Sequence, residues 1–249
     1  MGKLDGKVAL VTGSGRNIGR ATVLKLASEG AHVVVNARAN QAEADAVVRE
    51  AQARGVKALG VIADVARRDQ VERMVERALS ELGRIDILIS NAAIRPHKPF
   101  TELTVEDWEA VRGVVLDGAM YCTRAVIPSM VANRYGRVVY LTGEGTFVGG
   151  SGRAHVSAAK MGLVGLARGL ASEFAAHNIR VNVVSPGSID TTRANPEWYQ
   201  GRPPSAAGIP LGRQGTVDEI AATCLFLVGD DSGFITGQTI HVNGGIAYY

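Results

Sequence analysis

The chain has 249 residues, and its 27 Lys and Arg against 24 Asp and Glu give a formal net charge of +3. No linker rich in Pro, Gly or Ser divides it, so we predict one domain over residues 1–249. The basic residues are few and scattered, which argues against nucleic acid as the main partner. Cys122 and Cys224 lack metal-ligand spacing, so we expect a reducing compartment and no metal site.

The first ten residues lead directly into an apolar run and do not resemble a signal peptide. Gly2 does not begin a myristoylation motif, because Gly6 stands where Ser or Thr is required. The longest apolar runs look too short to span a bilayer. We therefore expect a cytoplasmic protein with no membrane partner.

The stretch 8–19, VALVTGSGRNIG, organises the rest of the chain. Residues 8–11 form an uncharged apolar run that predicts a buried strand, and the glycine-rich segment 12–19 predicts a tight turn into a helix over about 18–28. A second apolar strand is expected at 31–37. Strand, glycine turn and helix N-terminus bring free backbone N–H groups close to an anion, so this βαβ unit predicts a pyrophosphate site.

Strands and helices continue to alternate after this unit. We expect further strands at 56–63, 85–90, 136–141, 179–184 and 239–242, and helices at 41–53, 68–82, 104–130, 156–177 and 217–228. Such alternation predicts an α/β fold, a doubly wound parallel sheet of the Rossmann type in three layers. Ligands of these sheets bind at the carboxyl ends of the strands, where the glycine turn also lies.

Several motifs resemble those of the short-chain dehydrogenase/reductase (SDR) family, over residues 7–245. TGSGRNIG at 12–19 is similar to the cofactor turn TGxxxGxG, with Asn17 for the middle glycine, a mild change because Asn tolerates left-handed backbone. Further matches are DV at 64–65, NAA at 91–93, RVN at 180–182, PGSIDT at 186–191, ITGQ at 235–238 and VNGG at 242–245.

The resemblance implies a dinucleotide cofactor, a small-molecule substrate and a homotetramer assembled through the two long helices and the C-terminal segment. It also implies a substrate lid over about 188–215, in which Trp198 and Tyr199 would cover a ligand or simply pack. The cofactor-binding residues that it implies are Gly13, Ser14, Arg16, Asn17, Ile18, Gly19, Arg38, Asp64, Val65, Asn91, Ala92, Lys160, Pro186, Gly187, Ile189 and Thr191.

Charge at the end of the second strand favours NADP(H) over NAD(H). NAD-binding proteins place Asp or Glu there to hold the ribose hydroxyls, whereas this chain has Asn36 with Arg38 close behind. Arg16 lies in the glycine turn, as in the NADP-preferring subgroup that it resembles. Two guanidinium groups and no carboxylate should favour a 2′-phosphate.

The catalytic pattern of the family is only partly present. The family uses Asn, Ser, Tyr and Lys, and Lys160 matches the Lys. Counting along the motifs places Val156 where the Tyr would stand, Gly143 where the Ser would stand and Val115 where the Asn would stand. None of these three side chains can donate or accept a proton. A hydride transfer between a carbinol and nicotinamide needs a proton donor or acceptor at the same carbon.

Either other residues transfer the proton, or the protein catalyses a reaction other than hydride transfer. We take Lys160, Glu144 and His155 as catalytic candidates, although Glu144 could be an exposed loop carboxylate and His155 a packing residue. Arg95, His97 and Asp117 are weaker candidates near the same edge. Three hypotheses follow: an oxidoreductase with relocated acid/base groups; a non-redox lyase, isomerase, dehalogenase or group-transfer enzyme; and a non-catalytic dinucleotide-binding regulator.

Overall fold

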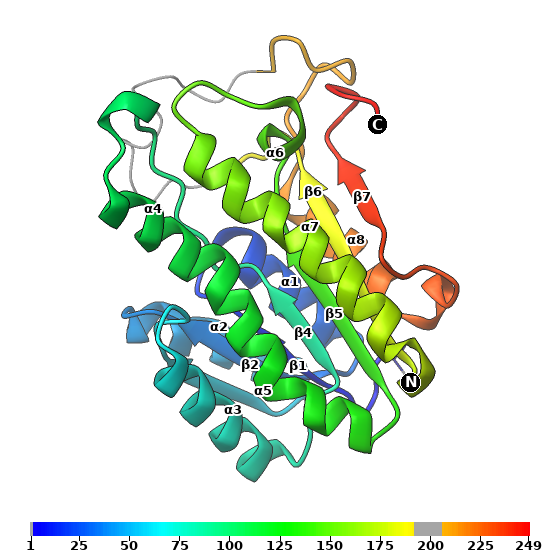
Figure 1. Cartoon of the computed structure of the whole chain (residues 1–249). Helices are drawn as coiled ribbons and strands as arrows, with labels where there is room; N and C mark the ends of the chain where they lie inside the picture. Colours follow the sequence, from blue (N-terminus) through cyan, green and yellow to red (C-terminus); the bar gives the residue numbers. More distant parts are fainter. Residues whose placement is uncertain (1, 192–205) are drawn as a thin grey trace.

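A sheet of seven parallel strands forms the centre of the computed structural model, which describes residues 2–191 and 206–249 (Figure 1). The strand order is β3-β2-β1-β4-β5-β6-β7, the doubly wound arrangement that the alternation predicts. The strands are β1 (Val8–Val11), β2 (His32–Ala37), β3 (Ala58–Ile62), β4 (Ile87–Ser90), β5 (Gly136–Leu141), β6 (Ile179–Pro186) and β7 (Thr239–Val242).

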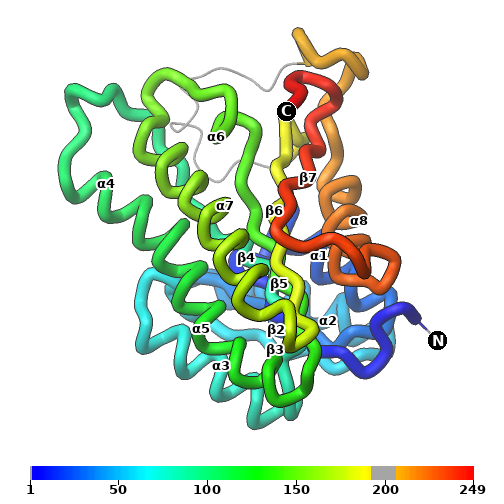
Figure 2. Tube along the Cα trace, turned by 45° about the vertical axis from the view of Figure 1, so that its right-hand side comes forward, coloured from blue at the N-terminus to red at the C-terminus, as the bar shows by residue number. Residues whose placement is uncertain are grey.

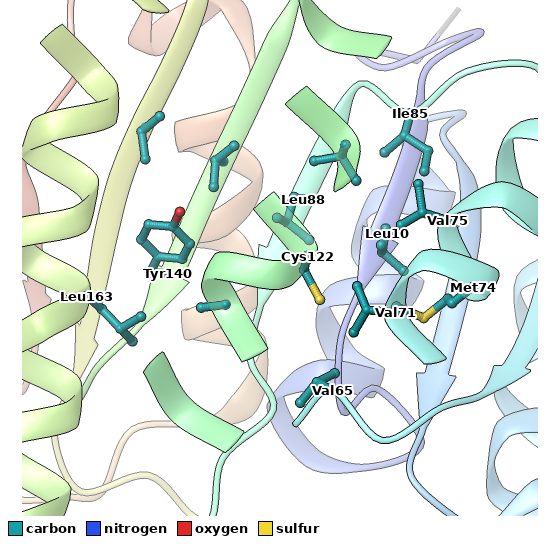
Figure 3. Packing of buried hydrophobic residues seen from close by; sticks show 14 of the residues in the cluster. Leu10, Val65, Val71, Met74, Val75, Ile85, Leu88, Cys122, Tyr140 and Leu163 are labelled. Carbon is teal, nitrogen blue, oxygen red and sulfur yellow. The ribbon is translucent and has the colours of Figure 1, made fainter. Parts of the chain in front are cut away.

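Helices cover both faces of the sheet, as Figure 2 shows. One face packs against α1 (Asn17–Ser28), α2 (Gln41–Gln52) and α8 (Val217–Val228), and the other against α3 (Arg68–Leu82), α5 (Gly118–Ala132) and α7 (Ala154–Phe174). Strand residues alternate between the faces, so a strand covered on both sides must be apolar at every position. In Figure 3, Leu10, Leu88 and Tyr140 of three strands meet side chains of α3, α5 and α7.

The predicted long helix at 104–130 consists of three parts. It begins with α4 (Val105–Arg112) and ends with α5, and between them Gly113–Asp117 form a π-helical segment that contains Val115. Short elements escaped the sequence analysis because they hold no full hydrophobic period. They are the helix α6 (Gly145–Val148) and the 3-10 turns η1 (Phe100–Glu102), η3 (Ala175–His177) and η5 (Asp230–Ser232).

The expectation about membrane-spanning length was wrong in one respect. The continuous helical stretch Val105–Ala132 is long and apolar enough to cross a membrane by length and composition alone. In the fold, its α5 part packs on α3 and on strands β4 and β5. A core helix of a globular protein passes the same test of length and composition, so this stretch is weak evidence for a membrane span.

Loops at the carboxyl ends of the strands gather along one edge of the sheet. They include the glycine turn after β1, the segment 91–99 after β4 and the segment 142–153 between β5 and α7. Trp198 and Tyr199 of the predicted lid lie outside the described residues, so their covering role stays a prediction.

Candidate functional site

Buried side chains fix the glycine turn from below. The amide nitrogen of Asn36 donates to the carbonyl oxygens of Val61 and Ala63 at 3.3 and 3.0 Å, and its oxygen accepts from the backbone N–H of Gly13 at 3.2 Å. The Ser14 hydroxyl donates to the carbonyl of Val11 at 2.7 Å and accepts from the Asn36 N–H at 3.0 Å. Both side chains therefore support the turn.

These contacts give Asn36 a structural role beneath the glycine turn, in addition to its predicted place beside the ribose. Asn36 is only 1% exposed, and its amide is committed to the three neighbouring backbone groups just named. Asn36 and Arg38 both border the cavity, and Arg38, two residues on, is exposed. Of the two side chains, the exposed Arg38 is the one that remains open to a ligand, and its role toward the ribose stays a prediction.

The segment after β4 ties the turn from the other side. The Asn91 amide nitrogen donates to the carbonyls of Thr12 and Gly13 at 3.0 and 2.9 Å. In return, the Thr12 hydroxyl accepts from the backbone N–H groups of Asn91 and Ala92. β1 and β4 are neighbours in the sheet, so the loops that follow them lie side by side, and these hydrogen bonds hold each loop in place against the other.

The turn leaves no room for a larger side chain at Gly19. A Cβ there would lie 2.5 Å from the Gly13 carbonyl oxygen and 2.7 Å from the Asn91 amide nitrogen. Asn17 adopts a φ of 50°, which confirms that it takes the left-handed conformation expected at this position. α1 begins with no capping side chain among the described residues and no acidic residue in its first turn, so the positive end of its dipole, which borders the cavity, favours an anion.

A cavity of about 490 Å³ runs along this edge. All the predicted cofactor-binding residues border it except Ser14, which lies beneath the turn. The crowded glycine turn and the open helix N-terminus fit a pyrophosphate, and Asp64 and Val65 lie beside the adjoining part of the cavity. The residues present therefore fit a dinucleotide, and the individual assignments stay predictions.

Sequence analysis missed a carboxylate beside the two arginines. Glu43 of α2 borders the cavity with Arg16 and Arg38, and its Oε1 lies 3.9 Å from Nη1 of Arg16. The expectation of guanidinium groups without a carboxylate is therefore wrong. A signal was present: Asn40 caps α2 and accepts from the N–H of Glu43 at 3.1 Å, which places Glu43 in the first turn, facing the loop after β2.

Lys160 of α7 reaches the opposite part of the cavity. Its Nζ donates to the carbonyl oxygens of Leu141 and Thr142 at 3.0 and 2.6 Å, at the end of β5. Only 8% of Lys160 is exposed. Burial, followed by the nearby charge of Arg95, lowers the pKa of Lys160 to about 7. Lys160 therefore interconverts between ammonium and amine near neutral pH.

The three positions at which we expect a departure from the family pattern differ in their surroundings. Val156 and Val115 are 7% and 2% exposed and belong to one apolar cluster. Gly143 borders the cavity, and within the described part of the chain a Cβ there would meet only the Pro186 carbonyl oxygen, at 3.9 Å. A serine would therefore fit at 143, while a polar group at 156 would have to leave the apolar cluster and turn toward the cavity.

Of the other catalytic candidates, all but Arg95 lie outside the cavity lining. Glu144 precedes α6 and is half-buried, and burial raises its pKa. His155 is 2% exposed, its ring nitrogens have no hydrogen-bond partner among the described residues, and burial lowers its pKa. Asp117 pairs with Arg112 at 3.1 Å, and His97 lies against Gly152. Only Arg95 and Lys160 of the candidates reach the cavity.

The seven-stranded parallel sheet and its crowded glycine turn define a dinucleotide-binding α/β protein. A family model described as "Enoyl-(Acyl carrier protein) reductase" matches residues 13–247. With this match, the chain belongs to the short-chain dehydrogenase/reductase family of oxidoreductases.

Curated relatives match along nearly their whole length. The chain is similar to a 3-oxoacyl-[acyl-carrier-protein] reductase from Synechocystis, 39% identical over 100% of both chains. It is also similar to the 3-oxoacyl-[acyl-carrier-protein] reductase FabG of Thermotoga maritima, 37% identical over 98% of this chain and 99% of that one. A third relative is the (2S)-[(R)-hydroxy(phenyl)methyl]succinyl-CoA dehydrogenase subunit BbsD of Thauera aromatica, 39% identical over 97% of each.

A solved structure shares the fold closely. It is a protein assigned as a short-chain alcohol dehydrogenase from Sinorhizobium meliloti 1021, with a TM-score of 0.91 and 32% identity, covering 98% of this chain and 97% of that one. The similarity confirms the Rossmann-like architecture predicted from the alternation of strands and helices.

Proposed function

We propose that the protein is an NADP(H)-binding oxidoreductase that acts on a small oxo or hydroxy compound and does not use the Tyr, Ser and Asn of the family pattern. The observation that carries the proposal is the single cavity that joins the glycine turn to Lys160. The relatives named as 3-oxoacyl reductases and as a hydroxyacyl-CoA dehydrogenase subunit support a substrate with an oxo or hydroxy group.

The arginine pair supports NADP(H). Arg16 and Arg38 border the cavity beside the end of β2, where a 2′-phosphate would lie in a dinucleotide bound along this edge. Guanidinium groups bind phosphate through charge-assisted hydrogen bonds. Glu43 weakens this preference and does not cancel it, because it is one carboxylate against two guanidinium groups.

Lys160 is our choice for the group that moves the proton. The bound nicotinamide would supply or accept the hydride. Two carbonyls hold the Lys160 Nζ in place, and burial brings its pKa to about 7, so both protonation states are populated near neutral pH. A general acid or base works best with a pKa near the working pH. Glu144 and His155 stay as second candidates.

A non-redox activity is the alternative. Its support is that Val115 and Val156 are buried in one apolar cluster. The family resemblance implies hydrogen-bonding side chains at these two positions. A lyase, isomerase, dehalogenase or group-transfer enzyme could use the same cavity without the nicotinamide reacting. A non-catalytic regulator would keep the dinucleotide and lack turnover with any substrate.

We also propose a cytoplasmic homotetramer. Trp108, Met120 and Met161, on α4, α5 and α7, expose apolar area on the helix layer that would carry one interface. Light scattering checks this assembly, and a particle of one 26.2 kDa chain would contradict it.

Calorimetric titration of the cofactor-free protein with NADPH, NADP⁺ and NADH tests the proposal. We expect binding of all three, with NADPH about ten times tighter than NADH, because the 2′-phosphate adds roughly 1.4 kcal/mol through the arginines. No binding of any dinucleotide would overturn the proposal and favour the non-redox alternative.

The double variant Gly143→Ser/Val156→Tyr then tests the missing groups. The space at 143 accepts a hydroxyl, and a tyrosine at 156 would lie one helical turn before Lys160. We expect NADPH-dependent reduction of a simple ketone to rise at least tenfold over the parent protein. An unchanged rate with intact NADPH binding would argue that the cavity no longer presents a carbonyl to the nicotinamide.

A further inference from the structure

The two ends of the cavity differ in charge. Beside the glycine turn and α2, Glu43 and Asp64 border it together with two arginines. At the end formed by β4, β5 and α7, Lys160 and Arg95 border it, and the described lining residues there include no Asp or Glu. The described wall of the substrate end is therefore cationic.

Lys160 keeps one donor for a ligand. An ammonium group has three N–H donors, and two of them go to the carbonyls of Leu141 and Thr142. The remaining proton belongs to a group that borders the cavity, in surroundings where burial strengthens electrostatic interactions.

The loop that carries Arg95 is anchored to the segment before α7. The Lys98 N–H donates to the Gly152 carbonyl at 2.9 Å, and the Arg153 guanidinium donates to the Arg95 carbonyl oxygen. The His97 ring occupies the space where a Cβ on Gly152 would lie. These contacts hold the Arg95 backbone beside the start of α7, and its charge is close enough to affect Lys160.

Two carboxylates of the described residues near this end, Asp107 and Glu144, do not border the cavity. Asp107 pairs with Lys98 and closes the capping box with Thr104 at the start of α4. Glu144 follows Gly143 but does not border the cavity. The rest of this end is small or apolar, with Ile94, Val114 and Gly143.

We infer that the substrate is a small oxo or hydroxy acid whose carboxylate binds Arg95 while its oxo or hydroxy oxygen lies beside Lys160. This inference rests on the proposed function for the reaction, while the anion site itself can be tested without it. A guanidinium holds a carboxylate through two parallel hydrogen bonds, and the apolar neighbours leave room for a short carbon chain.

The matched probes are acetoacetate and acetoacetamide, which have the same carbon skeleton and differ in charge. Each is titrated calorimetrically into the protein, with and without saturating NADP⁺. We expect acetoacetate to bind at least ten times more tightly than the amide and to lose that advantage in Arg95→Gln. Lys98→Gln is the control, since it removes a charge from the same loop at a side chain that does not border the cavity.

Arg95→Lys guards against a folding defect in the Arg95→Gln variant, because it retains the charge and should keep part of the preference. Equal affinity for acid and amide in the parent protein, or an acid preference that survives Arg95→Gln, would overturn the inference. If acetoacetate binds as expected but no dinucleotide does, the anion site stands and the proposed function fails. If NADPH binds and the acid preference is absent, the inference alone fails.

Discussion

The two halves of the cavity differ in the side chains that form them. In the half made by β1, β2 and β4, turn residues are held by buried hydrogen bonds from Asn36, Ser14 and Asn91. In the half made by β5 and α7, Val156 is buried and Gly143 borders the cavity, at the two positions where we expected polar side chains from the family pattern. Lys160 lies in the second half and is the residue there that matches the pattern.

This difference between the halves suggests separate roles: we assign cofactor binding to the first half and the reaction to the second. A glycine turn that is crowded at Gly19 and leads into a helix N-terminus fits an anion, and we predict that the dinucleotide pyrophosphate binds there. An apolar side chain in place of a proton-transfer group costs no stability, so such a change alters the reaction while the fold stays intact.

Gly19→Ala should have the largest effect. Its methyl group would lie within 2.5 Å of the Gly13 carbonyl oxygen, so the turn must open and its N–H groups move away from the pyrophosphate. We expect calorimetry to show NADPH affinity reduced about a hundredfold or more, roughly 2.7 kcal/mol.

Gly165→Ala is the matched control for this change. Gly165 lies on α7, and a Cβ there meets none of residues 2–191 or 206–249 within 4 Å. Alanine favours a helix over glycine by about 1 kcal/mol, so this variant should melt slightly higher and bind NADPH normally. A Gly19→Ala protein with unchanged affinity would show that the dinucleotide does not use this turn.

Lys160→Met should change stability in a pH-dependent way. The pKa of Lys160 is lowered from 10.5 to about 7, so between these pH values the unfolded chain binds more protons than the folded one. The stability of the parent protein therefore rises with pH across this window. The variant lacks the buried charge, and at pH 6 we expect its Tm to be higher by about 4 °C, roughly 1–2 kcal/mol after the loss of two hydrogen bonds.

The advantage of Lys160→Met should vanish or reverse by pH 10, where the parent lysine is neutral and still donates to the two carbonyls. Melting curves at both pH values check it. Lys57→Met serves as a control for an exposed lysine and should show no such trend. A constant difference between Lys160→Met and the parent across this range would mean that the lysine is not buried as a charge.

The sequence predicted the fold and most of the cavity wall because both depend on local signals. Apolar runs gave the strands, and the glycine turn identified the edge of the sheet. The role of Asn36 could not be predicted, because it depends on contacts with Gly13 and with β3, which only the folded sheet brings together. Glu43 was missed for the same reason: a helix pattern does not show which neighbouring loop its first turn faces.

Glu43→Gln should have the smallest effect, and it tests the charge balance most directly. Its carboxylate lies 3.9 Å from the Arg16 guanidinium and would repel a 2′-phosphate bound there. Without that charge, we expect NADPH to bind about three times more tightly, roughly 0.6 kcal/mol, while NADH affinity stays within about 1.5-fold. Calorimetry with both dinucleotides gives the ratio.

Glu50→Gln is the control on the same helix, since Glu50 pairs with Arg20 and does not border the cavity. It removes the same charge at a similar exposure, so it should leave the NADPH to NADH ratio unchanged. A fall in NADPH affinity in Glu43→Gln would mean that the carboxylate mainly orients Arg16. An unchanged ratio would mean that the 2′-phosphate does not lie between the two arginines, because a carboxylate this close to Arg16 would repel a phosphate bound there.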